Sequence, residues 1–264
     1  LRDAHDAASE RNLPFQIHAA QSATEFYEMQ RRHGQTPIGW MDDIGVLTDR
    51  SIIGHGIFMD HHPWLHWTSR DDLGRMAESG ATIAHCPTVF VRRGIALNTF
   101  GEYGRRGINL GIGTDTYPHN YLDEMRTALY TARAVGGSVA DLKTTDVFNA
   151  ATVGGARALR RDDIGRLAVG ARADIVMSDL KHPAMMPVRE PLRSLIYVAG
   201  DRAIREVFVD GDHVVRAGQV QTIDLAAASQ ALEDAQQRSM AKVPSRDWAG
   251  RDTDTLAPMV LPVE

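Results

Sequence analysis

The sequence has few of the features that mark secreted, membrane-spanning or nucleic-acid-binding proteins. Its 264 residues contain one cysteine, Cys86, which excludes an internal disulfide and a cysteine-based zinc site and favours a reducing, cytoplasmic compartment. The apolar runs are short and interrupted by charge, and the first residues do not resemble a signal peptide. The 29 basic and 34 acidic residues are spread along the chain, which argues against nucleic acid or an anionic membrane as a partner.

The residues that are present have the composition of a folded globular protein, with 43% hydrophobic and 24% charged residues. Short apolar segments recur about every 30 to 37 positions, with segments of helical composition between them. This alternation predicts βαβ units, a parallel sheet and the α/β class. The predicted strands lie at 15–17, 51–54, 81–84 and 108–114.

The remaining segments divide the chain further. Capping and stop signals predict helices at 1–12, 22–33, from Thr36-Pro37 onward, 69–78, 98–106, 121–134 and 145–159. After 160 the composition becomes β-rich, and the Asp210-Gly211 pair predicts a hairpin between 204–209 and 213–215. A helix at 225–242 and an extended tail at 244–264 follow. We therefore expect three parts, residues 1–160, 161–220 and 221–264.

Four successive predicted strands are each followed by a residue that binds metals or transfers protons: His18, His55, His85 and Asp115. Active sites of α/β folds are built at the carboxyl ends of parallel strands. Any one of these histidines alone is more often a buried structural residue, and Asp115 has the alternative role of a helix N-cap. Their recurrence at four strand ends predicts a site.

At these positions the chain resembles the amidohydrolase superfamily, in its branch of heterocycle deaminases and triazine hydrolases. The resemblance implies a partial (β/α)8 TIM barrel that contains the equivalents of strands five to eight, followed by part of a small β-sandwich and a C-terminal helix. The chain is then expected to be the C-terminal portion of such a protein. The resemblance rests on His18-Ala19-Ala20-Gln21, Gly54-His55-Gly56, Ala84-His85-Cys86-Pro87, Gly113-Thr114-Asp115 and the segment 164–176.

The resemblance also implies one divalent metal ion, zinc or alternatively iron. The family holds it with a His-x-His pair on the first strand, a histidine on the fifth and an aspartate on the eighth, and only the last two have counterparts here, His18 and Asp115. Because two ligands hold zinc weakly, we expect little stoichiometric metal in this chain alone. By the same resemblance, Asp115 is the general base and His55 orients the attacking water.

Three further residues are expected at the substrate: Gln21, His85 and His119. Gln21 departs from the family, which usually has glutamate there, and a glutamine cannot carry a proton. Either the substrate needs no protonation at this point, or another group supplies it, or Gln21 only begins the helix beside Ser22. Phe90, in the segment Thr88-Val89-Phe90, predicts an apolar wall. Arg92 and Arg93 would meet an anionic substrate group or form a solvated pair.

The sequence thus favours a metal-dependent hydrolase of a C–N or C–halogen bond in a small cyclic amine, amidine or amide. Alone, this chain is expected to be inactive, and the full-length form is expected to be a homo-oligomer. The alternative is a non-catalytic binding or scaffold subunit of the same fold that lacks the metal pair. A third reading, an autonomous α/β ligand-binding domain, leaves the polar strand ends unexplained.

Overall fold

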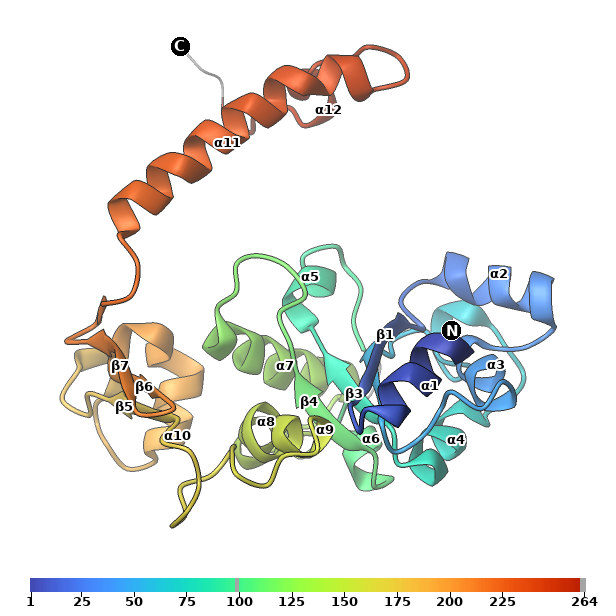
Figure 1. The fold of residues 1–264 in the computed structure, drawn as a ribbon, viewed down its shortest axis with the longest axis horizontal. Helices are drawn as coiled ribbons and strands as arrows, with labels where there is room; N and C mark the ends of the chain where they lie inside the picture. The colour runs from blue at the N-terminus through green and yellow to red at the C-terminus, as the bar shows by residue number, and fades with distance from the viewer. Residues whose placement is uncertain (98–99, 262–264) are drawn as a thin grey trace.

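A four-stranded parallel sheet lies at the centre of the fold (Figure 1). The computed structural model describes residues 1–97 and 100–261. All neighbouring strands pair in parallel, in the order β1-β2-β3-β4, which confirms the α/β class and the parallel sheet. The strands are β1 (Phe15–Ala19), β2 (Ser51–His55), β3 (Thr82–His85) and β4 (Asn109–Ile112).

Helices connect these strands and begin at the predicted caps. The Ser22 hydroxyl accepts a hydrogen bond from the Glu25 amide at the start of α2, and Thr36 does the same at the start of α3. Gly34, in the left-handed conformation, ends α2. The connecting elements are α1 (Arg2–Glu10), α2 (Ala23–His33), α3 (Pro37–Asp43), η1 (Pro63–Leu65), α4 (Asp72–Ser79), α5 (Pro87–Val91), α6 (Phe100–Arg105) and α7 (Tyr121–Gly136).

Several predicted boundaries differ from the structure. The helix expected from residue 69 begins at Asp72, because the carboxylate of Asp60 accepts the amide protons at its start. The strand expected to reach 114 ends at Ile112. The short helix α5 was not predicted, and the start of the helix expected from residue 98 lies outside the described residues.

The helix expected at 145–159 is a succession of three pieces, α8 (Thr144–Asn149), the π-helix η2 (Ala150–Gly154) and α9 (Gly155–Ala158). The π-helix packs closely on β4. A Cβ added to Gly154 would lie 2.0 Å from the Leu110 carbonyl oxygen, and the Asn109 side chain donates to the Gly154 carbonyl at 3.0 Å. The glycine therefore allows the π-helix to contact the edge of the sheet.

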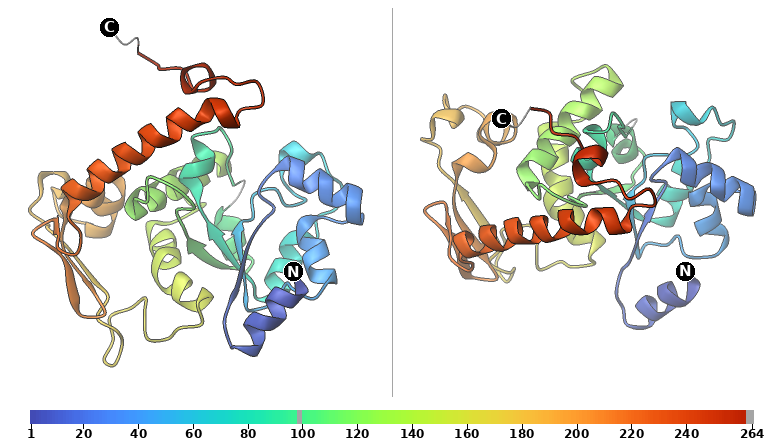
Figure 2. Two further views of the ribbon diagram at one scale, coloured as in Figure 1. Left: turned by 45° about the horizontal axis from the view of Figure 1, so that its top comes forward. Right: turned by 90° about the horizontal axis from the view of Figure 1, so that it is seen from above.

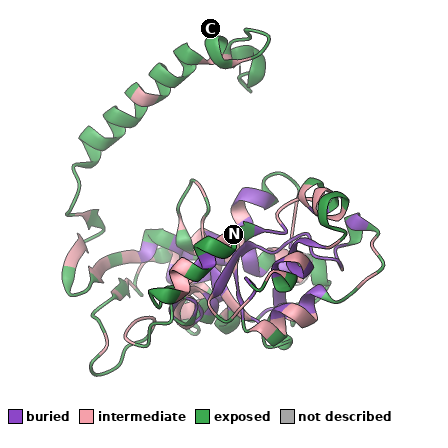
Figure 3. Cartoon of the chain, turned by 45° about the vertical axis from the view of Figure 1, so that its right-hand side comes forward, coloured by how far each residue is buried: buried purple, intermediate pink, exposed green. Residues whose placement is uncertain are grey.

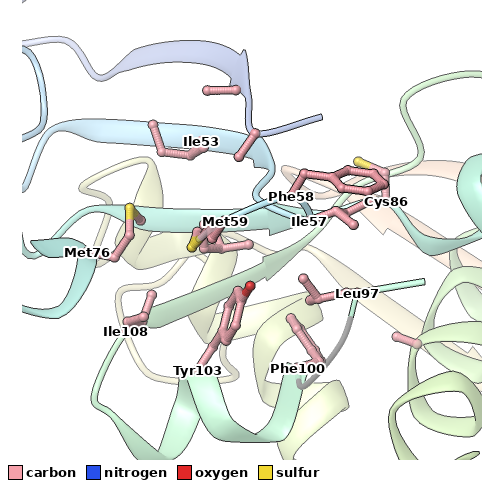
Figure 4. Close-up of a cluster of buried hydrophobic side chains, with 14 of the residues drawn as sticks. Ile53, Ile57, Phe58, Met59, Met76, Cys86, Leu97, Phe100, Tyr103 and Ile108 are labelled. Carbon is pink, nitrogen blue, oxygen red and sulfur yellow. The ribbon is translucent and has the colours of Figure 1, made fainter. Parts of the chain in front are cut away.

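The hydrophobic core surrounds the parallel sheet. Every residue of β2 is buried, as expected for an inner strand covered on both faces. The buried residues gather around β1–β4 and their helices (Figure 3), and Figure 4 shows Ile53, Ile57, Met59 and Tyr103 among them. This core fixes the strand ends that carry the polar side chains.

A second sheet follows, with the antiparallel order β5-β6-β7-β8. The predicted hairpin is confirmed: Asp210 and Gly211 both have positive φ and join β6 to β7. The pieces before β6 contact α7, where Ile196 joins the main core. The elements are β5 (Ile175–Ser178), η3 (Pro183–Met185), α10 (Pro191–Ser194), η4 (Leu195–Ala199), η5 (Gly200–Ala203), β6 (Ile204–Val209), β7 (Asp212–Arg216) and β8 (Gln219–Val220).

The C-terminal helix α11 (Leu225–Arg246) extends away from both sheets (Figure 2). It continues through Pro244, beyond the predicted end at 242. The expected extended tail is wrong in part, because α12 (Thr253–Leu256) forms within it, capped by the Asp252 carboxylate. No helix in the described ranges is long and apolar enough to cross a membrane. The three-part division of the chain stays a prediction.

Candidate active site

Three of the four predicted strand-end residues converge. Ligand-type atoms of His18, His55 and Asp115 all lie within 4.8 Å of one another, and the rings of the two histidines have their centroids 4.6 Å apart. His55 is buried, whereas His18 and Asp115 are exposed. The three side chains therefore form a polar group that is open on one side, with a composition suited to a divalent metal.

Gly54 makes room for His18. The two residues face each other in the register of β1 and β2, and a Cβ at position 54 would lie 2.6 Å from Cδ2 of the His18 ring. Side chains at neighbouring positions of this kind share one face of a sheet. The His18 ring can lie across β2 only because residue 54 has no side chain.

His55 departs from regular strand geometry. In a regular strand it would face the side opposite to Gly54, but its φ is +78°, and Gly56 follows with φ +58°. A non-glycine residue in this left-handed region carries strain of about 1–3 kcal/mol, and such strain is concentrated at functional sites. The unusual backbone accompanies the approach of the His55 imidazole to His18.

The His55 imidazole is buried without a hydrogen-bond partner for either ring nitrogen among the described residues. Phe90 packs edge-to-face against it at a centroid distance of 4.7 Å. Burial and, to a smaller extent, the nearby His18 lower the pKa of His55 to about 4, and Asp115 opposes the shift. The imidazole is therefore neutral near pH 7, which is the form that binds a metal or donates one hydrogen bond.

Asp115 lies three residues beyond the end of β4, and its φ is +58°. A Cβ on Gly113 would lie 2.9 Å from the Cys86 sulfur, so glycine permits the turns after β3 and β4 to pack together. Close by, the Thr114 hydroxyl lies 3.1 Å from Nδ1 of His119. The predicted substrate residue His119 is thus next to Asp115, and its role stays a prediction.

His85, the fourth strand-end residue, lies beside this group rather than in it. Its ring packs against Phe100 at a centroid distance of 4.8 Å, and it is buried. Burial lowers the pKa of His85 to about 3, with a smaller contribution from His55. A substrate contact by His85 stays a prediction.

Gln21 stands in a turn that is held by Glu25, a residue in the first turn of α2. Its carboxylate accepts the amide protons of Ala20 and Gln21 at 2.9 and 2.7 Å, and Ala20 has φ +51°. Glu25 therefore stabilises a strained turn, and its oxygens are engaged there.

Two charged side chains near the site have structural partners. Arg92 lies over the Tyr117 ring and donates to the Tyr117 carbonyl at 3.3 Å. The Glu124 carboxylate accepts the Thr88 amide proton at 3.0 Å, and burial raises the pKa of Glu124. These contacts join α7 and the turn after β4 to the turn after β3.

Comparison with known proteins identifies the family. The pattern of the amidohydrolase family matches residues 1–214. The chain belongs to the amidohydrolase family. The resemblance carried by His18, His55, His85 and Asp115 is thereby confirmed at the level of the family.

The curated relatives of this amidohydrolase include deaminases. The chain is 30% identical over 228 residues to the 5-methylthioadenosine/S-adenosylhomocysteine deaminase of Pyrococcus abyssi, covering 85% of this chain and 51% of that protein. It is 29% identical over 228 residues to the 5'-deoxyadenosine deaminase of Methanothermobacter thermautotrophicus, covering 85% and 51%. The chain spans about half the length of the curated relatives it matches.

Solved structures show the same relation. An adenosine deaminase from Xanthomonas campestris with bound zinc matches with a TM-score of 0.79 and 28% identity, over 88% of this chain and 52% of that chain. The atrazine chlorohydrolase TrzN of Arthrobacter aurescens TC1 complexed with zinc matches with a TM-score of 0.76 and 23% identity, over 87% and 50%. The latter likeness concerns the fold alone.

Proposed function

We propose that this chain forms half of the active site of a zinc-dependent deaminase, with a 6-aminopurine nucleoside or a similar cyclic amine, amidine or amide as substrate. The observation that carries the proposal is the convergence of His18, His55 and Asp115 within 4.8 Å. The adenosine-type deaminases among the relatives support the proposal. A C–halogen bond is the second candidate, favoured only by the likeness of fold to a chlorohydrolase.

We assign β1–β4 as strands five to eight of a (β/α)8 barrel. The likeness to zinc-binding amidohydrolase structures over about half of their length supports this assignment. In a closed barrel, four further strands would pair with the outer edges of β1 and β4. The remaining ligands of the ion then belong to residues outside these 264.

The donor set fits a divalent metal ion. His18 and Asp115 would hold it, and the neutral, unpartnered imidazole of His55 is close enough to be a third ligand. Zinc is the first candidate and iron the second, since imidazole nitrogens and a carboxylate suit both. When bound, such an ion activates a water molecule and polarises the substrate.

The residues of this chain would move the protons. Asp115 is exposed at the rim and has a carboxylate that accepts the proton of the attacking water and delivers it to the leaving nitrogen. His55 orients that water, and Phe90 excludes bulk water from the imidazole. Gln21 carries no proton and Glu25 is engaged by two amide groups, so any proton that the substrate ring needs comes from a group other than these two.

Replacement of Asp115 by asparagine tests this function. In the complete protein loaded with zinc, the Asp115→Asn variant keeps the shape of the side chain but loses the base, so turnover should fall by about 10²–10⁴-fold. Ammonia release from methylthioadenosine, S-adenosylhomocysteine, adenosine and an aminotriazine is the measurement. The matched control is Asp163→Asn, which removes a half-exposed carboxylate bound to Arg161 and Arg172 and should leave turnover unchanged.

Two outcomes would contradict the proposal. Retention of most activity by Asp115→Asn would exclude the carboxylate as the base. Binding of these compounds by the wild-type protein without any release of ammonia would favour the non-catalytic alternative.

A further inference from the structure

The strained turn at His55 and Gly56 requires support from its surroundings, because two consecutive residues are left-handed and only one of them is glycine. Part of the support comes from the loop after β1. The amide of Gly56 donates to the Ala19 carbonyl at 3.2 Å, and the amides of Ile57 and Phe58 both donate to the Ala20 carbonyl, at 2.9 and 2.7 Å. These bonds fix the amide groups of the turn, and its Gly56 carbonyl needs a donor as well.

That donor is Tyr103 on α6. Its hydroxyl donates to the Gly56 carbonyl at 2.9 Å, across 47 positions of the sequence. The side chain is fully buried, and Figure 4 shows the ring directed away from α6 among apolar side chains, with the hydroxyl oxygen at its tip. A buried hydroxyl costs about 1–3 kcal/mol if it lacks a partner, so this pairing is strongly specified.

The Tyr103 hydroxyl has a second neighbour. Nε2 of His61 lies 3.4 Å from the same oxygen. Because the only hydroxyl proton is given to Gly56, the hydrogen bond with His61 requires the proton on Nε2 of that imidazole. The tyrosine oxygen then accepts from His61 while its proton is donated to Gly56, a chain in which each bond strengthens the other.

The His61 imidazole lies beside a fixed carboxylate but makes no hydrogen bond to it, since neither Nδ1 of His61 nor Oδ1 of Asp60 has a hydrogen-bond partner among the described residues. Nδ1 of His61 lies 4.0 Å from Oδ1 of Asp60, and the other oxygen of Asp60 accepts from the Ser69 hydroxyl at 2.9 Å and from the Asp71 amide at 2.6 Å. Asp60 is buried and anchors the start of α4. The hydrogen bonds to the turn that carries His55 therefore extend as far as His61, and Asp60 lies next to that imidazole without bonding to it.

We propose that Tyr103, with His61 against its hydroxyl, is a positioning residue for His55. By holding the Gly56 carbonyl, it keeps the preceding residue left-handed and so aims the His55 imidazole at His18 and Asp115. This inference rests on the proposed function only for the role of the His55 imidazole at the metal ion and the attacking water. The orientation itself is a property of the metal-free protein.

The test is a pair of matched tyrosine variants in the complete, metal-free protein, selectively labelled with ¹⁵N histidine. Tyr103→Phe removes the hydroxyl from Gly56 and should shift both ring-nitrogen signals of His55 as well as those of His61. Tyr130→Phe removes a half-exposed hydroxyl that donates to the Tyr197 carbonyl at 3.3 Å, and should leave both sets unchanged. Unchanged His55 signals in Tyr103→Phe would overturn the proposal.

A second pair addresses the support from His61 and serves if Tyr103→Phe does not fold. His61→Gln keeps a side-chain N–H donor for the tyrosine oxygen and should retain the wild-type His55 signals, whereas His61→Leu should shift them. Equal His55 signals in the two variants would overturn the role of His61. If His61 acted only by filling space in the core, His61→Gln would not restore the His55 signals that His61→Leu shifts.

Zinc titration separates this inference from the proposed function. Residues that orient a metal-binding histidine typically change metal affinity by about 10–100-fold, so Tyr103→Phe should weaken zinc binding about tenfold relative to Tyr130→Phe. Zinc that leaves the His18 and His55 signals of the wild-type protein unchanged would contradict the metal site. It would leave the comparison of the metal-free spectra intact.

Discussion

The two four-stranded sheets of this chain differ sharply in burial. In β2 every residue is buried, whereas β5, β6, β7 and β8, all fully described, contain no buried residue. The second sheet leaves Val176 61% and Val209 51% exposed. An antiparallel sheet usually packs one face on a core, so this sheet depends mainly on its hairpin hydrogen bonds. The candidate site residues His18, His55 and Asp115 lie at or just beyond the strand ends of the first sheet, whose inner strand β2 is fixed by packing on both faces.

The largest expected effect concerns side-chain burial. Ile53→Ala in β2 should lower the free energy of unfolding by about 2–5 kcal/mol, because Ile53 is fully buried and the truncation leaves a cavity. Leu232→Ala in α11 is the matched control, since Leu232 is 72% exposed, and should change it by no more than about 0.5 kcal/mol. Urea unfolding of both variants measures the difference. Equal changes in the free energy of unfolding would contradict the difference in burial between Ile53 and Leu232.

The second effect is a difference in pH dependence. Burial raises the pKa of Asp72 to about 6, against about 4 in an unfolded chain. The unfolded chain therefore releases this proton at lower pH than the folded protein, and the free energy of unfolding should decrease as the pH rises from about 4 to about 6. The loss is at most about 3 kcal/mol. Asp72→Asn should remove this slope in unfolding experiments across that range.

A carboxylate of the C-terminal part should behave in the opposite way. Hydrogen bonds from Arg251 lower the pKa of Asp247 to about 2. Its contribution is present above about pH 4 and is lost as the pH falls towards 2. Asp247→Asn is therefore the control: it should lower the free energy of unfolding above about pH 4, where the carboxylate is charged, and make no difference near pH 2. A slope of the same sign for Asp72 and Asp247 would contradict the assignment of burial as the cause.

The smallest expected effect concerns two neighbouring glycines, of which only Gly154 packs against the first sheet. Gly154→Ala places a Cβ against the Leu110 carbonyl and should destabilise by about 1–3 kcal/mol through overpacking. Gly155→Ala is the neighbouring control, because a Cβ there meets nothing within 4 Å, and alanine in a helix should stabilise by about 0.5–1 kcal/mol. Thermal unfolding of the two variants measures effects of opposite sign. Destabilisation by both would place position 155 inside the packed region as well.

The sequence predicted the elements whose signals are local. The apolar strands, the caps at Ser22 and Thr36 and the Asp210-Gly211 hairpin are confirmed because each depends on residues a few positions apart. The π-helix and the continuation of α11 through Pro244 were not predicted. In both, the regular helical pattern of the side chains does not reveal how the backbone hydrogen bonds are made.

The candidate site could be predicted only in part. Strand ends identified His18, His55 and Asp115, and the structure brings them together. The support from Tyr103 could not be predicted, because its partner Gly56 is 47 positions away and a tyrosine in a helix carries no sign of a distant acceptor. The roles of Gln21, His85 and His119 at the substrate stay predictions.

The close packing of Cys86 against Gly113 makes the reactivity of this thiol a probe of the turns after β3 and β4. Cys86 is the single thiol of the chain, it is 7% exposed, and burial raises its pKa to about 12. Thiol reagents react with the thiolate, which is scarcely populated in the folded protein near pH 7. The reaction of Cys86 with thiol reagents should therefore be slow in the folded protein, and fast modification would indicate that the turns after β3 and β4 separate.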